Sequence, residues 1–199
     1  YVGQGSVRGR VLGMSDAAPT ARQLDTMRAI VARAMEQGAI GLSTGLYYAP
    51  GSYSTTDEVI ELAKVAAQHG GIYDSHMRDE SSYTIGLIGS INETIRIARE
   101  AKIPVHISHI KALGVDVWGQ ADTVIKLIRA ARAAGLDVTA DQYPYTASGT
   151  GVGAALLPRW AEEGGGDSLR ARIANPTIRA RLVKEMEEKL RKLEPWLRR

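Results

Sequence analysis

The fold is decided by GIYDSH at residues 71–76 and IPVHISH at residues 103–109. Each is a short β-prone run that ends in Ser-His, and the two histidines, His76 and His109, are 33 residues apart. A βαβ unit takes roughly 30 residues. The spacing therefore predicts two consecutive parallel strands, each with a histidine at its carboxyl end.

The same step extends in both directions along the chain. It reaches Thr44 after GAIGLS and Asp141 after LDVTA. A whole (β/α)8 barrel takes ~250 residues. The expected fold class is therefore α/β, a partial (β/α)8 TIM barrel of about four consecutive βα units plus a helical C-terminal insertion. Because barrel strands place their carboxyl ends on the functional face, we expect Thr44, His76, His109 and Asp141 to share one rim.

Helical patterns separate the expected strands. Thr20 with Gln23 and Thr55 with Glu58 have the spacing of capping boxes, and glycines end the apolar patterns that follow. These signals predict helices over 21–37, 57–69, 83–101 and 121–134.

The two ends of the chain lack the regular repeat of strand and helix. Residues 1–14 are expected to form the tail of a strand and a glycine-rich loop, and EEGGGDS (162–168) a flexible break. Asn175-Pro176 predicts a helix over 177–197 with proline in its first turn. We therefore divide the chain into a partial metal-dependent hydrolase barrel (1–153) and a helical lid or insertion (154–199).

Composition excludes several function classes. The net charge is +3, and the excess lies in residues 159–199, which carry 11 Lys/Arg and 7 Asp/Glu. These charges alternate in sign along one expected helix, which is typical of a solvated face and not of a nucleic-acid site. No apolar run approaches the ~20 residues of a membrane span. We expect neither a nucleic-acid nor a membrane partner.

The chain contains no cysteine, so it has neither disulfides nor thiolate metal ligands of its own. This fits a reducing compartment, and the expected location is cytoplasmic. The sequence opens at Tyr1 with no signal peptide, and its first residue is not methionine. We expect it to be an internal fragment of a longer protein.

The two histidines form a candidate metal site. Imidazole is the commonest metal-ligand side chain, and a catalytic zinc normally has three protein ligands and one open position. Period-two alternation in PVHISH groups His109 with Val105 and Ile107, and we assign to His109 the phase of His76. His106 is then expected to pack against helices. Two histidines at strand ends that bind no metal remain the alternative.

Other polar residues near the rim have roles that are structural or left open by their spacing. Asp141 is in step with the histidines and is either a further ligand or a base, which spacing does not decide. His69 is expected to be a surface or helix-capping residue. Arg78, Asp79 and Glu80 are expected to form an ion-pair cluster that shapes the loop after His76.

Several longer motifs resemble those of one enzyme family. SHMRDES (75–81), HISHIK (106–111), DQYPYTASGT (141–150) and GAIGLSTGLYYAPGSYSTTDEV (38–59) together resemble the N-acyl-D-amino-acid deacylases (D-aminoacylases) of the amidohydrolase superfamily. The similarity runs in order over about three quarters of the chain. It implies a zinc-dependent barrel hydrolase that removes the acyl group from N-acyl-D-amino acids.

The resemblance also implies roles for particular residues. His76 and His109 match the family's two histidine ligands on neighbouring strands. Lys111 and Tyr143 match residues that hold the substrate, its carboxylate in particular, and Tyr48 matches a tyrosine that faces it. Ser148 stands near the family's substrate-binding serine, but Ser-Gly is here in swapped order.

Departures from the family pattern bear on activity. Gln4 replaces the histidine of a G-H-G-like motif. The family's His-x-His pair, its cysteine ligand and its general-base aspartate have no counterpart here and are expected outside this sequence. The chain alone is therefore expected to be inactive, and the rest of a parent chain, or a like chain, to cover the open barrel edges. The alternatives are a cyclic-amide hydrolase of the hydantoinase or dihydroorotase type and a non-catalytic half-barrel that binds ligands.

Overall fold

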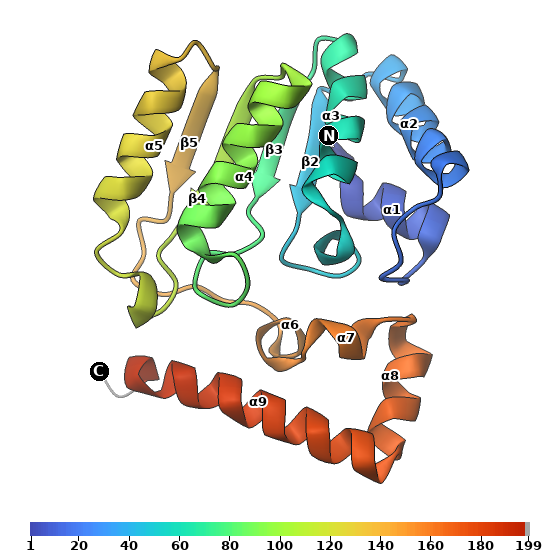
Figure 1. Cartoon of the computed structure of the whole chain (residues 1–199), viewed down its shortest axis with the longest axis vertical. Coiled ribbons are helices and arrows are strands. Elements are labelled where there is room, and N and C mark those ends of the chain that lie inside the picture. Colours follow the sequence, from blue (N-terminus) through green and yellow to red (C-terminus); the bar gives the residue numbers. More distant parts are fainter. Residues whose placement is uncertain (198–199) are drawn as a thin grey trace.

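The computed structural model describes residues 1–197, and its central feature is one parallel sheet in which strand order equals chain order, β1-β2-β3-β4-β5 (Figure 1). The order predicted from the repeat is confirmed, with β1 as an additional short strand. The strands are β1 Val2–Gly3, β2 Gly41–Gly45, β3 Ile72–His76, β4 Val105–Ile110 and β5 Val138–Gln142.

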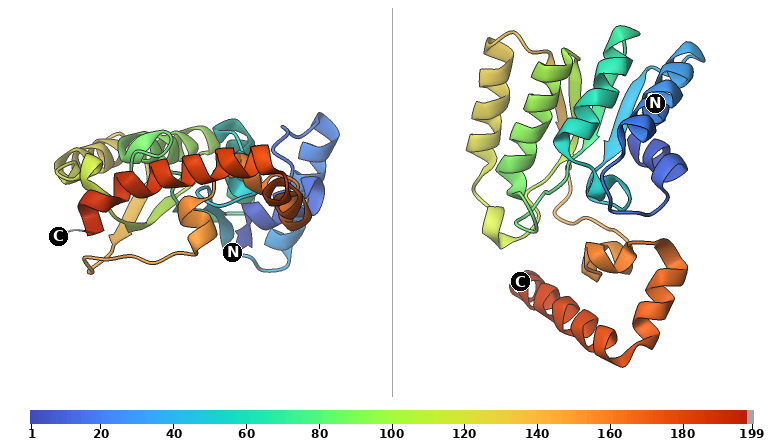
Figure 2. Two further views of the ribbon diagram at one scale, coloured as in Figure 1. Left: turned by 90° about the horizontal axis from the view of Figure 1, so that it is seen from below. Right: turned by 45° about the vertical axis from the view of Figure 1, so that its right-hand side comes forward.

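Helices between consecutive strands cover one face of this sheet (Figure 2). Right-handed β-helix-β crossovers place them there. They are α1 Gln4–Leu12, α2 Ala21–Glu36, α3 Thr56–Gln68, α4 Gly86–Ala101 and α5 Ala121–Ala133, with short 3-10 turns η1 Gly51–Tyr53 and η2 Val115–Val117.

The hydrophobic core lies between the sheet and these helices. Tyr73, Val105, Ile107 and Val138 are at most 2% exposed and belong to one core cluster with side chains of α2 to α5. Alternate residues of the same strands point to the other face, which carries polar side chains such as Asp74. The sheet therefore has one packed face and one open face.

The first 14 residues differ from the expectation. A short strand is present, but a helix, α1, takes the place of the glycine-rich loop. Tertiary contacts outweigh the low helix propensity of its glycines. Arg8 is fully buried and pairs with Glu58 at the start of α3, and Gln4 Nε2 donates to Ser54 Oγ (2.6 Å) and to Glu58 Oε1 (3.1 Å).

This burial also changes the second capping box. Thr55 accepts a hydrogen bond from the Glu58 backbone N–H (3.2 Å), but the Glu58 side chain turns inward to Arg8. The first box, Thr20 with Gln23, is complete as predicted. The helix expected from residue 83 begins three residues later, at Gly86, because the Asp79 carboxylate holds the preceding turn.

Beyond β5 the chain forms a layer of helices that lies across the carboxyl ends of the strands (Figure 1). Its members are α6 Val152–Leu156, α7 Arg159–Glu162, α8 Gly165–Ala174 and α9 Pro176–Leu197. The flexible break expected at 162–168 is wrong, since α8 begins at Gly165 inside it. Asn175 caps α9 by accepting from the backbone N–H groups of Thr177 and Ile178 (3.0 and 3.1 Å). Among the described residues, no helix combines the length and apolar character that crossing a bilayer requires.

The burial of Tyr73 leads to a prediction of how the free energy of unfolding depends on pH. The Tyr73 hydroxyl shares a hydrogen bond with Thr44 Oγ1 (2.7 Å), and burial raises its pKa to about 12. The unfolded chain ionises at the ordinary pKa of ~10, so the stabilisation is complete below pH ~10 and is lost as pH rises through the folded-state pKa. We expect urea-unfolding curves to show falling stability from pH 10 to 12. Tyr73→Phe should flatten that fall, and an unchanged slope would contradict this assignment.

Candidate metal centre at the strand ends

The two histidines that end the sequence repeats meet above the sheet. His76 ends β3 and His109 lies near the end of β4, and His76 Nδ1 is 2.8 Å from His109 Nε2. Their ring centroids are 4.5 Å apart. The central expectation from the sequence, that these two imidazoles converge, holds in the structure.

A β-bulge, which the sequence did not reveal, brings His109 into this position. On β4 and β5, Ile107 pairs with Ala140 and Ile110 with Gln142, so Ser108 and His109 together oppose Asp141. Bulges of this kind re-aim side chains and are common beside active sites. His109 also has a positive φ of 43°, which is uncommon for a residue other than glycine.

The simple alternation argument was therefore wrong for two side chains. Ser75 pairs with Ile107, so the same register would place His76 opposite Ser108. Under regular alternation His109 would point toward the helices, as Ile107 does. His106, expected to pack against helices, lies on the open face, where its Nδ1 is 2.8 Å from Thr139 Oγ1. The bulge lets His109 share the face of His76 despite its odd position.

Of the four residues predicted to share one rim, His76 and His109 form a pair and Asp141 supports it. Thr44 is buried and bonded to Tyr73 in the core, so its place on the rim was wrong. The Asp141 side chain accepts a hydrogen bond from the backbone N–H of His109, and this bond holds the pKa of Asp141 below its usual range. Asp141 Oδ2 is also 3.4 Å from His106 Nε2. Asp141 thus contacts the main chain of the bulge.

Glu80 is the carboxylate that contacts the pair's side chains. Its Oε1 accepts from Lys111 Nζ (2.5 Å) and is 3.2 Å from His109 Nδ1. Donor atoms of His76, Glu80 and His109 all lie within 4.8 Å of one another. Glu80 is 8% exposed, and its backbone C=O accepts from Leu113 N–H (2.8 Å), which joins the loops after β3 and β4.

The expected ion-pair cluster of Arg78, Asp79 and Glu80 does not form. Arg78 pairs instead with Glu93 of α4 (2.9 Å). Asp79 accepts from the backbone N–H groups of Ser81 (2.8 Å), Thr84 and Gly86 (3.0 Å). The three neighbours point in three directions because each finds its partner on a different element, which a sequence of adjacent charges does not specify.

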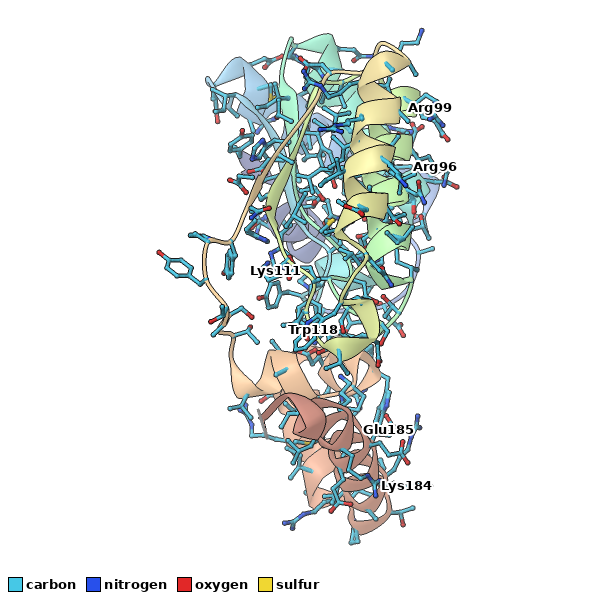
Figure 3. The ribbon with its side chains drawn as sticks, turned by 90° about the vertical axis from the view of Figure 1, so that its left-hand side faces the viewer. Arg96, Arg99, Lys111, Trp118, Lys184 and Glu185 are labelled. Carbon is cyan, nitrogen blue, oxygen red and sulfur yellow. The ribbon has the colours of Figure 1, made fainter. Side chains whose placement is uncertain are left out.

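The Lys111 side chain is held in place by Glu80, His109 and Tyr143. Its side chain is 12% exposed, its Nζ lies 4.5 Å from the centroid of the Tyr143 ring, and it reaches both Glu80 and His109 Nδ1 (2.8 Å). Figure 3 shows Lys111 between the strand ends and the helical layer. An ammonium has three N–H donors, so one bond to Glu80 leaves donors for a ligand.

A cavity of about 210 Å³ surrounds the histidine pair, and all the predicted substrate-binding residues line it. The Tyr48 ring lies 5.2 Å from the His76 ring, and the Tyr143 ring 5.9 Å from that of His109. Ser148 borders the cavity from the segment after β5. The structure thus brings His76, His109, Lys111, Tyr48, Tyr143 and Ser148 to one place.

The other residues that line this cavity include Tyr47, Glu80 and Tyr83, which were not assigned to the site from the sequence. The Tyr47 ring lies 6.3 Å from that of Tyr83, and its hydroxyl donates to Ala154 O of α6 (2.8 Å). Tyr47 belonged to the same Tyr-Tyr pair as Tyr48, so that pair was the available signal. Nothing local in the sequence pointed to Tyr83.

The donor set fits a divalent metal. Burial, followed by the nearby His109 and Lys111, lowers the pKa of His76 to about 4, so this imidazole is neutral at pH 7 and has a free lone pair. Neutral imidazole nitrogens are preferred ligands of zinc. His76 Nδ1 and His109 Nε2 face each other here at hydrogen-bond distance, at the ends of two neighbouring strands.

A second, larger cavity of about 800 Å³ adjoins the first and shares Lys111, Tyr143 and Ser148 with it. Its other walls come mainly from α5 and the ends of β4 and β5. Two apolar side chains on that side, Trp118 and Ile125, are 48% and 46% exposed. This cavity therefore lies at the open β5 edge of the sheet.

No protein-family model matches the chain. A D-aminoacylase from Alcaligenes xylosoxydans xylosoxydans is 41% identical over 149 residues, which are 75% of this chain and 30% of the relative. The chain therefore spans about 30% of the length of this curated relative.

Solved structures give the same picture. A D-aminoacylase structure studied for its binuclear metal centre superposes with a TM-score of 0.69 at 32% identity, over 86% of this chain and 38% of that one. The N-acyl-D-glutamate deacylase of Bordetella bronchiseptica, complexed with zinc and a phosphonate mimic of the tetrahedral intermediate, gives 0.67 at 33% identity, over 71% and 29%. The parallel sheet and its helices match part of these amidohydrolases.

Proposed function

Since this chain is homologous, over three quarters of its length, to part of the N-acyl-D-amino-acid deacylases of the amidohydrolase superfamily, we propose that it supplies the histidine-pair side of a zinc-dependent deacylase active site. The convergence of His76 and His109 carries this proposal. The substrates would be N-acyl-D-amino acids, and the reaction hydrolysis of their linear amide bond.

His76 and His109 would hold the metal. A divalent ion bound there would act as a Lewis acid toward the amide carbonyl and would make water more acidic. The Tyr48 ring lies tilted against His76 and the Tyr143 ring edge-on to His109, and these contacts would restrict the orientation of both imidazoles. The general-base aspartate and further ligands are expected outside this sequence, so we expect little turnover from the 199-residue chain alone.

Lys111 and Tyr143 would bind the substrate carboxylate. A carboxylate accepts charge-assisted hydrogen bonds from an ammonium, and Lys111 Nζ lies on the cavity wall beside the histidine pair. Fixing the carboxylate at one end orients the amide bond relative to the metal. Tyr48 and Ser148 border the same cavity from two other elements and would contact the rest of the substrate.

The helical segment 154–199 would act as a lid. The support is a set of contacts between this layer and the tyrosine-rich loop after β2. Tyr53 donates to Arg159 O (2.9 Å), Tyr47 donates to Ala154 O (2.8 Å), and the Arg159 guanidinium lies 4.5 Å from the centroid of the Tyr47 ring. The open β5 edge, with its exposed Trp118 and Ile125, would be covered by further polypeptide, from the same protein or a like chain.

The comparisons favour neither alternative reading. The curated relatives carry the names of D-aminoacylase, N-acyl-D-glutamate deacylase and N-acyl-D-aspartate deacylase, and no cyclic-amide hydrolase is among them. A non-catalytic half-barrel would not require two imidazole nitrogens 2.8 Å apart. The deacylase function therefore has the better support.

Binding of substrate analogues to the zinc-loaded chain tests the proposal without requiring turnover. We expect N-acetyl-D-amino acids to bind, as measured by calorimetry, and Lys111→Met to weaken that binding ~10–100-fold. This corresponds to one lost hydrogen bond to a charged group, worth ~1.5–3 kcal/mol. The matching N-acetyl-D-amino acid amides lack the carboxylate and should bind both proteins alike.

Lys64 provides the control, because it is an exposed lysine whose one ion pair among the described residues is with Glu61 of its own helix. Lys64→Met should bind both ligands like the wild type. If Lys111→Met weakens acid and amide equally, the carboxylate role is wrong. If the zinc-loaded wild type binds none of the acids, the deacylase proposal itself fails.

A further inference from the structure

Glu80 occupies a position that the proposed function does not yet use. Among the described residues it is the one carboxylate that lines the histidine cavity, and its Oε1 contacts both His109 Nδ1 and Lys111 Nζ. It lies in the loop after β3, four residues beyond His76. A backbone hydrogen bond to Leu113 fixes that loop against the segment that carries Lys111.

The two nitrogens of His109 face different partners. Nε2 faces His76, and Nδ1 faces Glu80. One imidazole offers only one nitrogen to a given ion, so an ion shared with His76 would take Nε2 and leave the proton on Nδ1. Histidine ligands commonly donate that second N–H to a carboxylate, which fixes both tautomer and ring orientation.

The closeness of Lys111 to His109 is the reason why a carboxylate is needed here. Its Nζ lies 2.8 Å from His109 Nδ1, and an ammonium has no lone pair with which to accept the Nδ1 proton. Without Glu80, Lys111 would donate to Nδ1 and favour the other tautomer, with the proton on Nε2. The Glu80 carboxylate can accept from both donors at once.

On the basis of the proposed function, we propose that Glu80 is a positioning residue that couples the metal ligand His109 to the substrate-binding Lys111. By accepting from both, it keeps Nε2 of His109 free toward His76 and keeps the Lys111 ammonium beside the metal pair. It acts through these two side chains and not as a ligand, because its Oε1 lies against His109 Nδ1 and not against the Nε2 atom that faces His76.

Zinc affinity, measured on the full chain by competition with a chromophoric chelator, is the first test. Loss of a supporting carboxylate typically weakens metal binding ~10–100-fold, and we expect this for Glu80→Ala. Glu80→Gln keeps an acceptor oxygen and should lose less. Glu93→Gln is the matched control, since Glu93 is also 8% exposed and its ion pair is with Arg78, not with either histidine. This variant should retain wild-type affinity. Equal zinc affinity in Glu80→Ala and wild type would overturn the proposal.

The tautomer of His109 in the metal-free chain is the second test, read from its ¹⁵N imidazole shifts. The share of the Nδ1–H form should be larger in the wild type than in Glu80→Ala, and an unchanged or larger share in the variant would overturn the positioning role. This measurement also separates the two proposals. A wild type that binds no zinc refutes the metal centre, while the tautomer comparison still decides what Glu80 does.

Discussion

Loss of stoichiometric zinc binding is the expected result of replacing His76 with alanine. The described residues bring two imidazole nitrogens together. Removal of the His76 imidazole leaves a single histidine ligand, His109, on the neighbouring strand β4. We expect the loss of affinity to exceed the ~10–100-fold effect of a supporting carboxylate. Zinc retained after dialysis, measured by elemental analysis, provides the readout.

His69→Ala is the matched control for this experiment. His69 follows the end of α3, where its Nδ1 is 3.0 Å from Val65 O, and it is exposed, as the sequence predicted. This variant should retain zinc at the wild-type ratio. Zinc retained equally by His76→Ala would show that the ion binds elsewhere and would remove the basis of the deacylase proposal.

A loss of about 3–5 kcal/mol in the free energy of unfolding is expected for Arg8→Met. Arg8 is fully buried, and its guanidinium pairs with Glu58 and donates to Ala17 O (2.7 Å). Methionine fills similar space but leaves the Glu58 carboxylate buried without its cation, and breaking a buried pair by removing one partner costs about that much. Urea unfolding gives the value.

Arg28→Met supplies the comparison, because Arg28 makes ion pairs with Asp25 and Glu61 on a partly exposed helix surface. Exposed pairs contribute about 0–1 kcal/mol. A further variant, Arg8→Met combined with Glu58→Gln, removes the unpaired charge and should recover part of the loss. If Arg8→Met lowers the free energy of unfolding no more than Arg28→Met does, the buried Arg8–Glu58 pair does not stabilise α1.

The regular parts of the fold could be predicted from the sequence because they rest on local signals. Repeated apolar strands at steps of 32 or 33 residues fixed the sheet order, and Thr20 with Gln23 fixed the start of α2. Helix α1 could not be predicted this way. Its glycines argue against a helix, and the contacts that hold it come from Glu58 and Ser54, some fifty residues away.

The candidate site was predictable in its residues but not in its geometry. Family motifs and spacing selected His76, His109 and Lys111, whereas the bulge that turns His109 to the face of His76 depends on the pairing of β4 with β5. The partners of Glu80 depend on which loops lie side by side above the sheet. Alternation within a single strand does not show that this strand has one residue more than its partner strand. For this reason the face on which His106 lies was predicted wrongly.

The agreement between strand order and chain order has a consequence for biogenesis. Each strand pairs with the one made immediately before it, so a nascent polypeptide can add one unit at a time as it leaves the ribosome. Contacts between segments close in sequence form quickly, and N-terminal parts can fold before synthesis ends. Once β4 and its following turn have emerged, both imidazoles and the Lys111 ammonium are available. The helical layer follows later, over strand ends that are already paired.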